Sequence, residues 1–89
     1  MKEEMAKEIF EQCQGTYLQI IDDSDSHKGH RGVDRNENTH FKVTIVSDTF
    51  NDQLKVKRHQ YVYAICKPFF DRGLHALSLN TLTVAEWKS

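Results

Sequence analysis

Cysteine, proline and long apolar runs are scarce in this 89-residue chain, which has two cysteines and one proline. Cys13 and Cys66 form no CxxC pair, and each falls on the apolar stripe of a predicted helix, which favours free, packed thiols. No apolar run approaches the ~18 residues that a membrane-spanning helix needs. These absences argue against a disulfide framework and against a transmembrane protein.

Net charge is also small, at −1, so no overall basic field attracts the protein to nucleic acid, and such binding would need a local patch. The amino-terminal stretch MKEEMAKEIFEQC is acidic and interrupted, unlike a signal peptide, so we expect a cytoplasmic protein. With 38% hydrophobic and 28% charged residues, the composition is typical of a globular chain. The length predicts one domain over residues 1–89 with a modest core.

Periodicity predicts six elements in the order α-β-β-α-β-α. Helical spacing of apolar residues covers Met1–Gln14 and Val56–Phe69, whereas alternation typical of strands covers Thr16–Ile21, Thr39–Val46 and His75–Leu82. A capping box from Thr83 to Glu86 predicts a final one-turn helix that seats Trp87.

The predicted elements are separated by turn formers. Asp22–Asn38 has one aliphatic residue and many turn-forming residues, which predicts a long solvated loop. Gly15 fits the position just after a helix, where a positive φ costs glycine little, and Gly73 is expected to end the second helix. Pro68 is expected to kink or tighten the last turn of the second helix, because it removes a hydrogen bond to Ala64.

The connections between the predicted strands define the fold class. The first two strands are adjacent along the chain and can pair as a wide antiparallel hairpin. The second and third are joined through a helix, which favours a parallel pair with a right-handed crossover. The sequence therefore predicts an α+β fold, in which a three-stranded mixed sheet carries the two longer helices on one face.

Several separated motifs carry a family resemblance. They are THFKVTIVSDTF at Thr39–Phe50, RHQYVY at Arg58–Tyr63, GLHALSLNTLT at Gly73–Thr83 and the closing EW at Glu86–Trp87. In order and spacing they resemble the BolA family, of the bacterial type, over nearly the whole chain. The resemblance implies an α+β fold related to the type II KH domain, in agreement with the predicted elements.

The resemblance also implies a function. BolA-like proteins associate with monothiol glutaredoxins, and the pair can share a [2Fe–2S] cluster to which the glutaredoxin and a bound glutathione each supply a cysteine sulfur. The family's ligand positions match His75 in GLHAL and His27 in the long loop, with His30 as the alternative to His27. Some bacterial members act instead as DNA-binding transcriptional regulators of stress and morphology genes, which provides the alternative function.

The residues themselves leave the roles of the histidines open. His75 begins the third strand with the parity of Leu77 and Leu79, which suits a rigid metal ligand but also fits an imidazole bonded to backbone. His40, at the start of the second strand, is interpreted as structural. His59 either braces the start of the second helix or joins a phosphate-contacting surface.

One local basic cluster precedes and opens the second helix, formed by Lys55, Lys57 and Arg58 beside His59. It is either a solvated helix face or a phosphate-binding surface at a helix amino end. The letters GxxG occur at Gly29–Gly32, but between strands rather than between helices, so we give them no RNA-binding role. No nucleophile–base pair, phosphate loop or cofactor fingerprint is recognisable, so an enzyme is not expected.

Overall fold

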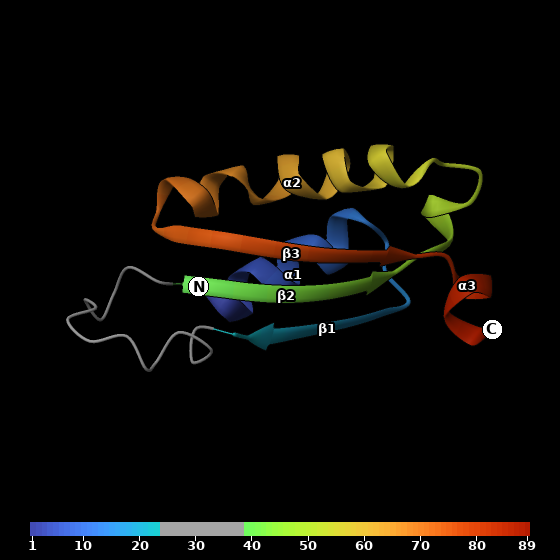
Figure 1. Ribbon diagram of the computed structural model, residues 1–89, viewed down its shortest axis with the longest axis horizontal. Coiled ribbons are helices and arrows are strands. Elements are labelled where there is room, and N and C mark those ends of the chain that lie inside the picture. The colour runs from blue at the N-terminus through green and yellow to red at the C-terminus, as the bar shows by residue number, and fades with distance from the viewer. Residues whose placement is uncertain (24–38) are drawn as a thin grey trace.

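A three-stranded mixed sheet lies at the centre of the computed structural model, which describes residues 1–23 and 39–89. Its strands are β1 (Tyr17–Asp22), β2 (Thr39–Val46) and β3 (Leu74–Leu82), in the order β1-β2-β3 (Figure 1). β1 pairs antiparallel with β2, and β2 pairs parallel with β3. The predicted element order and sheet pairing are confirmed.

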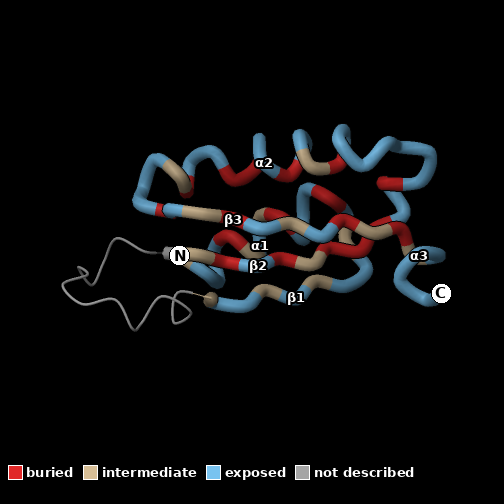
Figure 2. Tube along the Cα trace, in the orientation of Figure 1, coloured by how far each residue is buried: buried red, intermediate tan, exposed pale blue. Residues whose placement is uncertain are grey.

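The two long helices, α1 (Lys2–Gln12) and α2 (Lys55–Asp71), share one core with the central strand. The buried side chains of this core include Met5, Ile9 and Cys13 from the first helical segment, Val62, Ile65, Cys66 and Phe69 from α2, and Phe41, Val43 and Ile45 from β2. The β2 residues alternate along the strand, so they project from one face. Both helices therefore cover the same face of the sheet, and Figure 2 shows the buried residues gathered in β2 and on the inward sides of the helices.

The turn after α1 differs from the prediction. Gln14, with φ 53°, adopts the left-handed conformation expected of Gly15. Gly15 is required for a different reason, because a Cβ there would lie 2.9 Å from side-chain atoms of both Ile45 and Phe10. The glycine thus lets the chain pass close to the core on its way into β1.

Helix α2 runs through Pro68 and ends at Asp71 rather than at Phe69. The missing N–H of Pro68 is therefore tolerated inside the last turns of the helix. Gly73 lies just after the end of the helix, as predicted, and its φ of 116° accompanies the reversal of the chain into β3.

The predicted capping box forms at the last helix, α3 (Val84–Lys88), where the Thr83 and Glu86 side chains and backbone N–H groups bond reciprocally. Trp87 stacks on Tyr17 of β1, with 4.8 Å between ring centroids. This ring stack joins the short helix to the Tyr17 side chain.

Candidate functional site

A break in the β2–β3 ladder surrounds His75. Thr39 pairs with Leu74 and His40 pairs with Ala76, so His75 has no residue opposite it in β2. An extra residue of this kind forms a β-bulge, which re-aims side chains and is often found beside functional sites. Leu74 is buried and His75 is exposed.

The bulge overturns the parity predicted for His75. The sequence placed His75 on the same side as Leu77, yet Leu77 is buried while His75 is exposed. Within the part of the chain that the structure describes, no hydrogen bond or ion pair engages the His75 ring. His75 therefore lies at the surface of the protein rather than sealed in the core.

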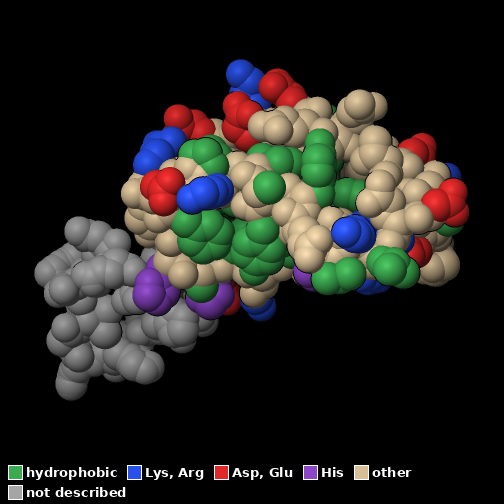
Figure 3. Space-filling model, turned by 90° about the horizontal axis from the view of Figure 1, so that it is seen from above, with side chains coloured by type: hydrophobic (Ala, Val, Ile, Leu, Met, Phe, Trp, Pro, Cys, Tyr) green, Lys and Arg blue, Asp and Glu red, His purple; other side chains and the backbone are tan. Residues whose placement is uncertain are grey.

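His40 and His75 lie at the same end of the sheet, where β2 and β3 begin. His40 is half-buried and interacts with other groups of the protein, and its carbonyl accepts the Asp23 N–H at 2.7 Å. Figure 3 shows histidine side chains gathered at this end of the molecule. The predicted ligands His27 and His30 lie outside the described residues.

The two thiols of the chain lie on the core side of the helices. Cys13 and Cys66 are both fully buried. Burial raises the pKa of each thiol to about 11, and the nearby Cys66 contributes to the shift of Cys13. Because the thiolate is the form that binds metals, neither cysteine is placed to ligate iron at the surface.

The predicted basic cluster at the start of α2 is divided by burial. Lys55 and Lys57 are exposed and His59 is half-buried, whereas Arg58 is only 6% exposed. Arg58 donates to the carbonyl oxygens of Gln53 at 2.9 Å and Thr81 at 3.0 Å. Its guanidinium is thus bonded within the protein, which leaves Lys55, Lys57 and His59 on the surface.

An apolar groove of about 660 Å³ follows the outer side of α2. Val56, Tyr63 and Phe70 are its large apolar lining residues, and the rings of Tyr63 and Phe70 stack with 6.1 Å between centroids. The Tyr63 hydroxyl donates to the Leu77 carbonyl at 2.8 Å, which ties this side of the helix to β3. Hydrophobic side chains gather over α2 in Figure 3, on the face that also shows the histidines.

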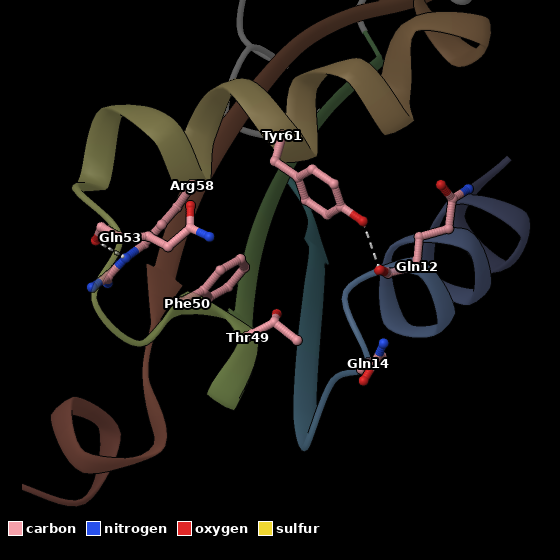
Figure 4. A pocket seen from close by; sticks show the side chains of 7 residues that line it. All are labelled: Gln12, Gln14, Thr49, Phe50, Gln53, Arg58 and Tyr61. Carbon is pink, nitrogen blue, oxygen red and sulfur yellow. Dashed lines mark hydrogen bonds between the residues drawn. The ribbon is translucent and has the colours of Figure 1, made fainter.

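A second hollow of about 250 Å³ lies between the end of α1 and the start of α2 (Figure 4). Its lining is rich in amide and hydroxyl groups, and the Tyr61 hydroxyl crosses it to donate to the Gln12 carbonyl at 2.9 Å. His75, the predicted ligand that the structure describes, does not line this hollow.

Residues 1–23 and 39–89 contain neither a ready-made metal site nor a membrane-spanning helix. In these ranges, no group of three or more His, Cys, Asp or Glu side chains is arranged to hold a metal ion. None of the helices formed by them has the length and apolar character needed to cross a bilayer.

Comparison with known proteins identifies the family. The family model described as BolA-like protein matches residues 2–86, so the chain belongs to the BolA-like family. The chain is 35% identical over 83 residues to the DNA-binding transcriptional regulator BolA of Haemophilus influenzae, covering 93% of this chain and 77% of that protein. It is 40% identical over 88 residues to Protein BOLA1, chloroplastic, of Arabidopsis thaliana, covering 97% of this chain but only 52%, about half, of the relative.

The solved structure of BolA1 from Arabidopsis thaliana has the same fold. It matches with a TM-score of 0.84 and 36% identity, over 97% of this chain and 94% of that one. Both the family resemblance and the α+β fold predicted from the sequence are therefore confirmed.

The α2 groove is a candidate surface that the sequence analysis did not predict. Its three large apolar residues, Val56, Tyr63 and Phe70, recur every seven residues. Seven residues make about two helical turns, so this spacing marks a second apolar stripe on α2 in addition to the one that faces the core. The helix was predicted from the apolar stripe that faces the core, and that stripe does not include these three residues.

Proposed function

We propose that this BolA-like protein pairs with a monothiol glutaredoxin and helps to coordinate a bridging [2Fe–2S] cluster, in iron–sulfur handling or sensing. His75 would supply one ligand, and His27, or alternatively His30, would supply a second. The observation that carries the proposal is the exposed His75 ring in the bulge at the start of β3. Imidazole nitrogen is an accepted ligand type for such clusters, so this donor fits the group.

The position of the thiols supports a cluster that is shared with a partner protein rather than one that is held by this chain alone. Iron–sulfur clusters are held mainly by cysteine thiolates. Cys13 and Cys66 are buried on the helix side with raised pKa values, away from the surface on which His75 is exposed. The thiolate ligands would therefore come from the glutaredoxin and from glutathione, and this chain would contribute nitrogen.

The α2 groove is the surface that we assign to the glutaredoxin. Phe70 and Asp71 line its carboxyl end, and only Arg72, Gly73 and Leu74 separate them from His75 along the chain. Tyr63, which also lines the groove, donates its hydroxyl hydrogen bond to the carbonyl of Leu77 in β3, the strand that contains His75. A protein seated in this apolar groove would thus reach the edge of the sheet that carries His75.

The test mixes this protein with a monothiol glutaredoxin, iron, sulfide and glutathione under anaerobic conditions. The proposal predicts a heterodimer with a visible spectrum different from that of the glutaredoxin homodimer. The variant Ala64→Arg introduces a charge into the groove without removing a buried group and should weaken the heterodimer. Glu11→Arg, at an exposed site on α1, is the matched control. A spectrum identical to that of the glutaredoxin alone would refute the pairing.

A second candidate function is DNA-binding transcriptional regulation. It is favoured by the printed name of the Haemophilus influenzae relative and by the exposure of Lys55 and Lys57 in the first turn of α2. Helix amino ends attract phosphate through unpaired N–H groups, and lysines at that end add positive charge.

Salt dependence tests the second function. Binding through phosphates weakens as salt rises, with a slope of about −0.9 per neutralised phosphate on a double-logarithmic plot. Charge reversal of Lys55 and Lys57 should weaken promoter binding. It should also reduce the magnitude of that slope by the amount expected for the loss of about two phosphate contacts. Unchanged affinity and slope in the double variant would exclude this surface.

A further inference from the structure

The two edges of the sheet are treated differently by the rest of the protein. On the outer edge of β3, the Leu77 carbonyl accepts a hydrogen bond from the Tyr63 hydroxyl at 2.8 Å. The Thr81 carbonyl on the same edge accepts one from the Arg58 guanidinium at 3.0 Å. Side chains of α2 thus donate hydrogen bonds to two outward carbonyl groups of β3, and they partly cover this edge of the sheet.

The outer edge of β1 has no such cover in the described part of the chain. Asp23 lies opposite His40 and donates to its carbonyl at 2.7 Å, which fixes the phase of the antiparallel ladder. Alternate residues of β1 then direct their backbone groups towards β2, and Leu18 and Ile20 direct theirs outwards. Within residues 1–23 and 39–89, no hydrogen bond to the outward groups of Leu18 or Ile20 is present, and no helix or strand lies beyond β1 in Figure 1.

The sequence of β1 also lacks the usual protection of an edge strand. Natural edges are commonly blocked by proline, lysine or a bulge, because an open edge pairs readily with another strand. The strand reads YLQIID and has no proline, lysine or bulge; its one charged residue, Asp22, stands at its last position, and its ladder with β2 is regular. Tyr17 is 36% exposed and Ile21 is 46% exposed, both on the face of the sheet that the long helices leave open.

We propose that β1 pairs antiparallel with β1 of a second copy of this chain, about a two-fold axis at Gln19. Residues directly opposite each other in a sheet share a face. This register places Gln19 opposite Gln19 of the second copy, Leu18 opposite Ile20 on the helix-covered face, and Tyr17 opposite Ile21 on the open face. In this register the outward N–H and C=O groups of Leu18 in one copy face those of Ile20 in the second copy. The backbone hydrogen bonds and the side-chain pairs therefore require the same alignment of the two strands.

The strand is chemically complementary to itself in this register. An aromatic side chain opposite a β-branched one is a favourable cross-strand pair, and two aliphatic pairs extend the core across the junction. The neighbouring registers that also keep faces matched are less favourable: the one centred on Leu18 would place Gln19 opposite Tyr17, and the one centred on Ile20 would place the Asp22 carboxylate opposite the aliphatic Leu18. The pairing centred on Gln19 is therefore the one that the sequence favours.

The proposed dimer leaves the candidate site accessible. β2 separates β1 from β3, so His75 and the α2 groove lie on the opposite side of each protomer from the shared edge. The inference is thus independent of the proposed pairing with a glutaredoxin, and either can fail without the other.

Cysteine cross-linking tests the register directly. In the variant Gln19→Cys, two thiols would face each other at the two-fold axis, where Cβ atoms of opposite residues lie about 4.5–5.5 Å apart. Copper phenanthroline as oxidant removes two electrons and two protons from the pair and leaves a disulfide. Asn80→Cys is the matched control, because Asn80 is exposed on β3 in the same cross-strand row as Gln19 and Thr44. We expect Gln19→Cys to form covalent dimers at least about 10-fold faster than Asn80→Cys.

Sedimentation equilibrium of the unmodified chain supplies the second measurement. We expect a concentration-dependent monomer–dimer equilibrium that Gln19→Lys shifts at least about 10-fold towards monomer, because it places like charges opposite each other. Gln19 is exposed, so the circular dichroism of this variant should not change. Equal cross-linking rates for the two cysteine variants, a chain that stays monomeric at all concentrations, or a dimer unaffected by Gln19→Lys would each overturn the inference.

Discussion

Arg58 of α2 and Glu86 of α3 form an ion pair in which Nη1 of the guanidinium lies 2.8 Å from Oε1 of the carboxylate. The same Oε1 accepts the Thr83 N–H at 2.9 Å, so one oxygen joins the buried arginine to the capping box of α3. The pair connects the start of the long helix to the end of the chain, across β3. It explains why Arg58, predicted from the sequence to lie on a solvated helix face or a phosphate-binding surface, is buried.

Replacing Arg58 is therefore expected to affect stability before it affects any ligand. Arg58→Met should lower the free energy of unfolding by about 2–3 kcal/mol, because it leaves the Gln53 and Thr81 carbonyls without a donor. Lys57→Met, at the exposed neighbouring position, should change it by less than about 0.5 kcal/mol. Urea unfolding of the two variants measures the difference. Equal stabilities would show that the buried guanidinium contributes nothing to the fold.

The ion pair also predicts how stability responds to acid. The hydrogen bond from Arg58, together with that from the Thr83 backbone, lowers the pKa of Glu86 from 4.5 to about 2. A carboxylate whose pKa is lower in the folded state stabilises the fold above its unfolded pKa, and this contribution is lost as the pH falls. The free energy of unfolding should thus decrease between about pH 4.5 and pH 2.

Glu86→Gln should reduce this acid dependence. Its free energy of unfolding should be lower than that of the unmodified chain at neutral pH and should fall less steeply through the same range. Glu4 also has a lowered pKa, owing to its hydrogen bond with Arg72, so part of the slope should persist in the variant. Denaturant unfolding at a series of pH values gives both curves. Parallel curves would contradict the role assigned to Glu86.

The two glycines next to the helices should respond differently to alanine. Gly15→Ala should cost about 1–3 kcal/mol through crowding with Ile45 and Phe10, and the added change Phe10→Ala should recover part of that loss. Gly73→Ala should cost about 1 kcal/mol because its φ is 116°, and Phe10→Ala should not relieve it. A double-mutant cycle measures the coupling. The crowding explanation fails if Gly15→Ala and Phe10→Ala are additive.

The buried thiols should be unreactive in the folded protein. A pKa of about 11 rather than 9.0 lowers the thiolate fraction at mildly alkaline pH by about 100-fold, and burial slows access further. A disulfide reagent should therefore label Cys13 and Cys66 slowly under native conditions and rapidly in denaturant. Rapid labelling of the native protein would show that the thiols are accessible, and would reopen their exclusion as iron ligands.

The fold was predictable because its signals are local and regular. The stripe of Met5, Ile9 and Cys13 and the alternation of Phe41, Val43 and Ile45 both follow from the repeat of a single element. All six residues are buried as their spacing predicts. Helix ends shifted by only a few residues, since terminal turns depend on caps more than on apolar spacing.

The features that were not predicted depend on contacts between distant segments. The parity of His75 follows from a bulge in its pairing with β2, and no residue near His75 marks that irregularity. In the sequence, Arg58 belongs to a run of basic residues. It is buried because the fold brings Thr81 and Glu86 into contact with its guanidinium. The predictions for the site therefore needed more correction than those for the fold, because the positions of single side chains depend on tertiary structure.

Electron–nuclear double resonance would show whether the His75 imidazole donates nitrogen to iron in a shared cluster. The heterodimer would be assembled from this chain labelled with nitrogen-15 histidine and an unlabelled glutaredoxin, and its cluster reduced to the paramagnetic state. Coordination by His75 predicts a strong nitrogen-15 coupling that is diminished in His75→Ala and retained in His59→Ala. A coupling that is absent, or that is unchanged in His75→Ala, would contradict it.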